Sequence, residues 1–112
     1  MSKQFVNRPF TILESSGSLA ANGSISGSAE CKGYGTLRGL LRTDAATTSG
    51  SGVIIEQSPD SGENWYLVSA SDAVGASAIV SYDLAIVGNA VRVTACNGAA
   101  TANIQATFYL LP

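Results

Sequence analysis

The sequence contains no histidine, only two cysteines and few charged residues. Without histidine, neither a Ser-His-Asp triad nor a Cys-His pair can form. Two thiols with no imidazole make a poor metal site, so we expect neither a metal nor any other cofactor. Charged residues make up 12% of the chain, which is about half the usual share. These absences argue against the commonest hydrolytic and metal-dependent chemistries.

Positive charge and long apolar runs are also scarce. The six basic residues are dispersed and the net charge is −2, so we expect no nucleic-acid partner. No apolar run approaches the roughly 18 residues of a membrane span, and the start lacks a secretory signal pattern. We therefore expect a protein made and kept in the cytoplasm, with no membrane partner. In that reducing compartment, Cys31 and Cys96 are interpreted as partly buried thiols, although a disulfide between them stays open.

Short β-rich runs, separated by Gly, Ser, Asn and Asp, fill most of the chain. The expected strands are residues 10–14, 24–31, 35–43, 52–58, 65–70, 76–84, 90–96 and 101–111. About eight strands at this spacing predict a single-domain, all-β fold over residues 10–112. A β-sandwich of jelly-roll type fits best, and an immunoglobulin-like sandwich is the alternative. Residues 1–9 are either a disordered segment or an arm that becomes ordered against a neighbour.

The last run, residues 101–111, alternates most clearly. Its apolar residues are Ile104, Ala106, Phe108 and Leu110, and its polar row is Asn103, Gln105, Thr107 and Tyr109. Because that polar row has no charge to discourage edge-to-edge pairing, we predict that the strand lies inside its sheet or packs against a copy of the chain. The candidate interface residues are Gln105, Thr107 and Tyr109, together with Phe5 and Val6 in the N-terminal segment.

A turn motif, S-x-D-x-G-x-x-W, joins two of the expected strands through Ser58, Asp60, Gly62 and Trp65. The Asp60 carboxylate can accept backbone N–H groups, and Gly62 supplies a φ that bulkier residues resist. Trp65 is expected to bury its ring beneath the turn. The pattern resembles the Asp-box turn of sialidases, but it occurs once, in a chain too short for a propeller. We interpret it as a structural turn without glycosidase activity.

No side chains form a convincing catalytic pair. None of the carboxylates has apolar flanks that would raise its pKa as a catalytic acid requires; the pairs considered are Asp60 with Glu63 and Glu56 with Asp72. We therefore predict no catalytic residue. Aromatic side chains could instead stack against sugars, which keeps carbohydrate binding open; the available rings are Tyr34, Trp65, Tyr66, Tyr82 and Tyr109.

Residues 53–66, followed by Ala-Val-Arg-Val-Thr at 90–94, resemble a recurring pattern in small virion proteins of tailed bacteriophages. In that pattern a strand ends in a Ser-x-Asp-Gly-like turn before a Trp, a later strand carries x-Val-Arg-Val, and the chain ends in an alternating strand. The resemblance covers residues 34–112, and Ser61 is an extra residue in the turn. It implies a non-enzymatic structural role in the virion.

The resemblance makes a capsid decoration (cement) protein the leading hypothesis. Such proteins are often homotrimers that bind and stabilise the phage head, which implies the major capsid protein or another virion protein as the partner. The alternative is a carbohydrate- or receptor-binding module of a phage tail or fibre.

Overall fold

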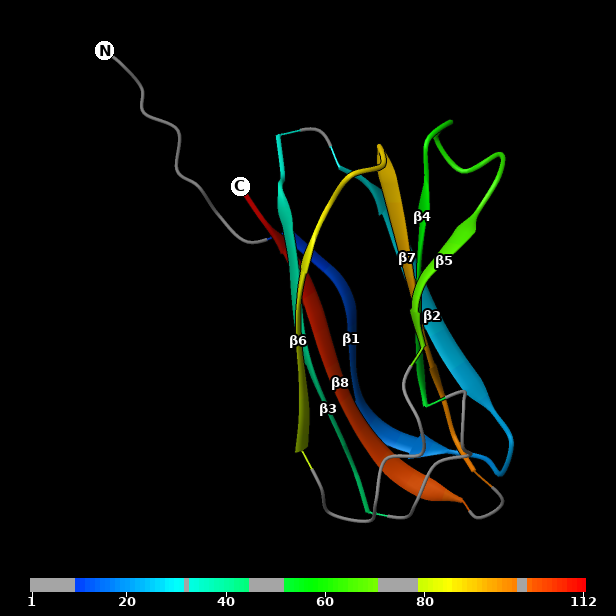
Figure 1. Cartoon of the computed structure of the whole chain (residues 1–112). Coiled ribbons are helices and arrows are strands. Elements are labelled where there is room, and N and C mark those ends of the chain that lie inside the picture. Colours follow the sequence, from blue (N-terminus) through cyan, green and yellow to red (C-terminus); the bar gives the residue numbers. More distant parts are fainter. Residues whose placement is uncertain (1–9, 32, 45–51, 71–78, 99–100) are drawn as a thin grey trace.

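The computed structural model describes residues 10–31, 33–44, 52–70, 79–98 and 101–112. Its eight strands are β1 (Phe10–Leu19), β2 (Ser24–Glu30), β3 (Thr36–Thr43), β4 (Val53–Ser58), β5 (Tyr66–Ala70), β6 (Ile79–Ala85), β7 (Ala90–Cys96) and β8 (Ala102–Leu111). The strands form two layers that face each other (Figure 1). The predicted all-β sandwich is confirmed.

The strand order identifies the sandwich as a jelly roll. One sheet has the order β1-β8-β3-β6 and the other β2-β7-β4-β5, and every pair is antiparallel. The first strand pairs with the last, the second with the seventh, the third with the sixth and the fourth with the fifth, as in a long hairpin rolled into two sheets. The immunoglobulin-like alternative is wrong, because there the first two strands would pair, whereas here they lie in different sheets.

The core lies between the two sheets. Its largest fully buried side chains are Phe108, Leu37, Leu41, Ile55, Ile104 and Leu110. Phe108 packs against the ring of Tyr82, with the ring centroids 5.5 Å apart. It also covers Gly39, where an added Cβ would lie 2.1 Å from Phe108 Cδ2. The centre of the core therefore depends on a glycine that lets a phenyl ring reach the backbone of β3.

Strand β8 lies inside its sheet, between β1 and β3, as one of the two predicted options requires. Its length also explains why β1 extends further than expected. We predicted a strand that ends at Glu14, but β1 continues through Ser15 to Leu19 because each of these residues pairs with β8, from Ala106 to Ala102. Pairing with a long neighbour has overridden the weak strand propensity of a Ser- and Gly-rich segment.

Some of the residues named in the predictions cannot be placed in the fold. Residues 1–9, with Phe5 and Val6, and Asp72 lie outside the part of the chain that the structure describes.

Cys31 and Cys96 are free thiols, and burial raises the pKa of each. Among the described residues, no helix is long and apolar enough to cross a membrane.

Candidate functional site

The outer face of the β1-β8-β3-β6 sheet is the candidate functional site. Strand register aligns its outward side chains in three rows across the four strands. The rows are Ser16–Gln105–Arg42–Ile79, Glu14–Thr107–Leu40–Ser81 and Thr11–Tyr109–Arg38–Asp83. These twelve residues are called the outer face below.

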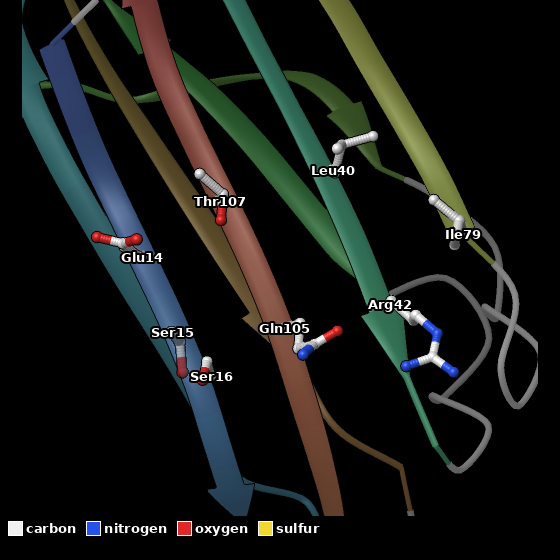
Figure 2. A pocket seen from close by; sticks show the side chains of 8 residues that line it. All are labelled: Glu14, Ser15, Ser16, Leu40, Arg42, Ile79, Gln105 and Thr107. Carbon is white, nitrogen blue, oxygen red and sulfur yellow. The ribbon is translucent and has the colours of Figure 1, made fainter.

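Three neighbouring depressions hollow the outer face. The first, of about 310 Å³, is shown in Figure 2 and is lined by Glu14, Ser15, Ser16, Leu40, Arg42, Ile79, Gln105 and Thr107. The second, of about 300 Å³, shares Ser16, Arg42 and Gln105 with the first and extends to Asp44 and Asn103. The third, of about 340 Å³, shares Leu40 with the first and reaches Tyr109. Shared lining residues make the depressions parts of one shallow surface.

The outer face combines apolar groups with balanced charges. Leu40 and Ile79 are 52% and 66% exposed. Its two arginines and two carboxylates cancel, and one pair, Arg38 with Asp83, forms an ion pair at 3.4 Å. Both members of that pair are more than half exposed, so it adds little stability. Such a surface suits contact with another neutral, partly apolar surface.

Arg42 contributes a charged group to the first depression. No hydrogen bond or ion pair of its guanidinium is found among the described residues, and Figure 2 shows it beside Gln105 at the hollow. The nearby Asp44 carboxylate is already engaged, because it accepts the backbone N–H of Asn103 at 2.9 Å and its side-chain amide at 3.1 Å. Arg42 and Gln105 therefore supply donors beside the apolar Leu40.

The turn motif lies elsewhere, in the β4–β5 hairpin. Ser58 Oγ donates to Asp60 Oδ1 at 2.6 Å and accepts the backbone N–H of Gly62 at 2.9 Å. Asp60 Oδ1 also accepts the backbone N–H of Asn64 at 2.8 Å. Gly62 has a φ of +99°. These hydrogen bonds, from Ser58 first and then from Asn64, lower the pKa of Asp60 to about 2. Asp60 is thus an ionised turn cap and not a proton donor.

The Trp65 ring lies against the turn, where a Cβ added to Gly62 would be 3.4 Å from its Cζ2, but the ring is only partly buried. Trp65 is half-buried, and the guanidinium carbon of Arg92 lies 4.4 Å from the centroid of its ring. Arg92 in turn forms an ion pair with Glu56, with Nη2 2.9 Å from Oε1. Because Arg92 and Glu56 are paired across β7 and β4, the Trp65 ring packs on a cross-strand ion pair and not in the core.

A buried glutamine, which the sequence did not single out, holds the β6–β7 loop. Gln57 is 4% exposed. Its Nε2 donates to the carbonyl of Ala85 at 3.0 Å, and its Oε1 accepts the N–H groups of Val87 and Gly88 at 2.8 Å each. Alternation in the 52–58 run indicates only that Gln57 points inward; its partners lie about 30 residues away.

The predicted interface residues are partly brought together. Gln105, Thr107 and Tyr109 all lie on the outer face, where the structure adds residues that sequence reasoning missed; these are Glu14, Leu40, Arg42 and Ile79. Their own strands show alternation, but no sequence signal indicates which strands are neighbours. The aromatic residues considered for sugar stacking do not share one surface. Tyr82 packs on Phe108, whereas Tyr66 lies on β5 in the other sheet.

The fold is similar to that of known β-proteins. PBSX exported protein XepA matches with a TM-score of 0.73 and 15% identity, over 97% of this chain, which spans 39% of XepA. The Yersinia pseudotuberculosis-derived mitogen YPM matches with a TM-score of 0.57 and 14% identity, over 93% of this chain and 86% of YPM. A mutant of the carbohydrate-binding module CBM29-2 matches with a TM-score of only 0.45 and 13% identity, over 94% of this chain and 80% of that one.

At these identities the likeness to XepA and YPM shows a shared fold alone. No protein-family model matches the chain, and no curated protein matches it in sequence. Among the described residues, no group of three or more His, Cys, Asp or Glu side chains could hold a metal ion. Arguments about function therefore depend on the surface of this chain.

Proposed function

We propose that this chain is a non-enzymatic structural protein of a phage particle, and that it decorates the head as a homotrimer bound to the major capsid protein. The observation that carries the proposal is the outer face, a shallow, charge-balanced surface with exposed Leu40 and Ile79. The virion-like pattern in residues 53–66 and 90–94 supports the same role. The chain also shares its fold with PBSX exported protein XepA.

A decoration protein of this kind stabilises a shell by adding interfaces that must be re-exposed when the shell breaks. Burying the exposed parts of Leu40 and Ile79 would contribute about 1–2 kcal/mol each. The contribution per copy is modest, but it is repeated at each lattice site, and a trimer binds through several such faces at once. Strong charge is not required, which agrees with the low charge content of the chain.

The proposal is tested by mixing the purified protein with capsids assembled from the major capsid protein that the same genome encodes. The particles are then sedimented. We expect co-sedimentation of the native protein, and loss of binding when Gln105→Lys and Thr107→Lys place two charges on the outer face. The matched control is Ser26→Lys with Ser28→Lys, because both serines are exposed on β2 in the other sheet. A native protein that is strictly monomeric and ignores capsids would overturn the proposal.

The second candidate function is carbohydrate or receptor binding by a tail or fibre protein. It is favoured by the donors of Arg42 and Gln105 beside Leu40, a mixture of polar and apolar groups that suits a sugar ring. A glycan array with the native protein, Arg42→Ala and Tyr109→Ala tests this function, with Tyr34→Ala and Tyr66→Ala as aromatic changes elsewhere on the chain. If no glycan gives a signal above background, the carbohydrate-binding function is wrong.

A further inference from the structure

Strand β5 is an edge strand with an unusual surface. Within the described residues it pairs with β4 alone. Its residues Tyr66, Leu67 and Val68 are 61%, 63% and 44% exposed, and the strand has no charge and no proline. The other edge strands each carry an acidic residue: β1 has Glu14, β2 ends in Glu30 and β6 has Asp83. Of the four edge strands, only β5 lacks a charge of the kind that normally discourages pairing.

An apolar groove adjoins the same strand. It has a volume of about 220 Å³ and is lined by Gln57, Ser58, Pro59, Tyr66, Val68, Val87 and Gly88. Val87 is 87% exposed, so the groove is open to solvent. A register shift in the β4–β5 pair leaves Val68 as an extra residue beside the groove; such bulges commonly re-aim a side chain. An unpaired strand edge next to an apolar groove is the arrangement that binds an extended segment with apolar side chains.

Residues 1–9 have the composition of such a segment. They contain the adjacent apolar residues Phe5 and Val6, and they include two of the six basic residues of the chain, Lys3 and Arg8. All eight acidic residues lie in residues 10–112, which hold only four basic ones. Two of the acidic residues, Asp60 and Glu63, lie in the turn that leads into β5. The segment and its proposed binding site are therefore complementary in charge.

The topology favours a groove on another copy. Residues 1–9 lead into β1, which lies at the β1–β2 side of the sandwich, whereas β5 and β6 are the edge strands of the opposite side. The start of β1 and the β4–β5 turn are at the same end of the molecule (Figure 1). Copies placed side by side would bring the β1 side of one next to the β5 edge of the next. Contacts of this head-to-tail kind close into a ring, such as a trimer, when the rotation between copies closes, and otherwise produce open filaments.

We propose that residues 1–9 of one copy add as a strand to β5 of the next copy, with Phe5 or Val6 in the groove formed by Tyr66, Val68 and Val87. This inference deepens the homotrimer of the proposed function by assigning its contact. It is tested without capsids, so its failure can be distinguished from a failure of capsid binding.

The first test measures oligomer mass by sedimentation over a range of protein concentrations. We expect Phe5→Asp with Val6→Asp, and separately Val68→Lys, to weaken association at least about tenfold, because each variant places charge in an apolar contact. The matched control is Ser26→Lys, which adds the same charge at an exposed residue of β2, outside both the groove and the outer face. A native protein that stays monomeric, or a Val68→Lys variant that associates as the native protein does, would overturn the inference.

The second test locates the contact and does not depend on destabilising variants. Phe5 is replaced by the photo-cross-linking analogue benzoylphenylalanine, and isotope-labelled and unlabelled proteins are mixed before irradiation. We expect cross-links from position 5 to residues 66–68 or 87, in peptides that join a labelled and an unlabelled chain. Cross-links confined to a single chain, or directed to the outer face, would show that the occupant or the site is wrong.

Discussion

Arg92 lies over the ring of Trp65, with its guanidinium carbon 4.4 Å from the ring centroid. The same guanidinium is held in place by Glu56 on the neighbouring strand, whose Oε1 accepts from Nε at 2.9 Å. The lone tryptophan is therefore part of a surface stack that links the β4–β5 turn to strands β4 and β7. This position changes how much its removal should cost.

We expect Trp65→Ala to lower the free energy of unfolding by about 1.5–3 kcal/mol, less than the 3–5 kcal/mol expected for a large ring buried in a core. The reason is that the ring is half-buried and packs on Arg92. Urea unfolding of Trp65→Leu, Arg92→Gln and the double variant gives the coupling free energy between the Trp65 ring and the Arg92 guanidinium. A coupling free energy of zero would mean that the stacked geometry contributes nothing.

Gly39→Ala should be among the most damaging small substitutions. The added Cβ would lie 2.1 Å from Phe108 Cδ2, and Phe108 is fully buried, so the ring must move against a packed core. We expect a loss of at least about 1–3 kcal/mol in the free energy of unfolding. The control is Gly17→Ala on β1, where an added Cβ meets nothing within 4 Å. Equal unfolding midpoints for the two variants would contradict this account of the core.

The hydrogen bonds to Asp60 should make stability depend on pH in the acid range. Because the pKa of Asp60 is lowered from 3.8 to about 2 in the folded protein, its stabilising contribution is fully present above about pH 4. The contribution is lost as the pH falls through about 2. Unfolding experiments between pH 2 and 6 should therefore show a smaller acid-induced loss for Asp60→Asn than for the native protein.

The control for this pH effect is Glu63→Gln, which removes a carboxylate from the same turn outside the Ser58–Asp60–Asn64 network. It should retain the native pH dependence. If Asp60→Asn and the native protein lose stability in parallel between pH 4 and 2, the turn cap is not the source of the acid sensitivity.

Local pattern was sufficient for much of the fold. Alternation in residues 101–111 correctly assigned Ile104 and Phe108 to the core and Gln105 to the surface, since a strand exposes every second side chain. The absence of charge on that outward row predicted two options, and β8 follows one of them because it lies inside its sheet. These properties depend on residues close together in the sequence, so the sequence alone determined them.

Tertiary structure decided the properties that depend on distant residues. Arg42 and Gln105 are neighbours only because β3 pairs with β8, and Ile79 joins them only because β6 pairs with β3. Pairing with β8 likewise extends β1 beyond Glu14. The turn motif predicted that the Trp65 ring lies beneath its own turn, but only the tertiary structure places Arg92, a residue of β7, against that ring. Strand pairing across tens of residues thus created the outer face, which the strands cannot specify one at a time.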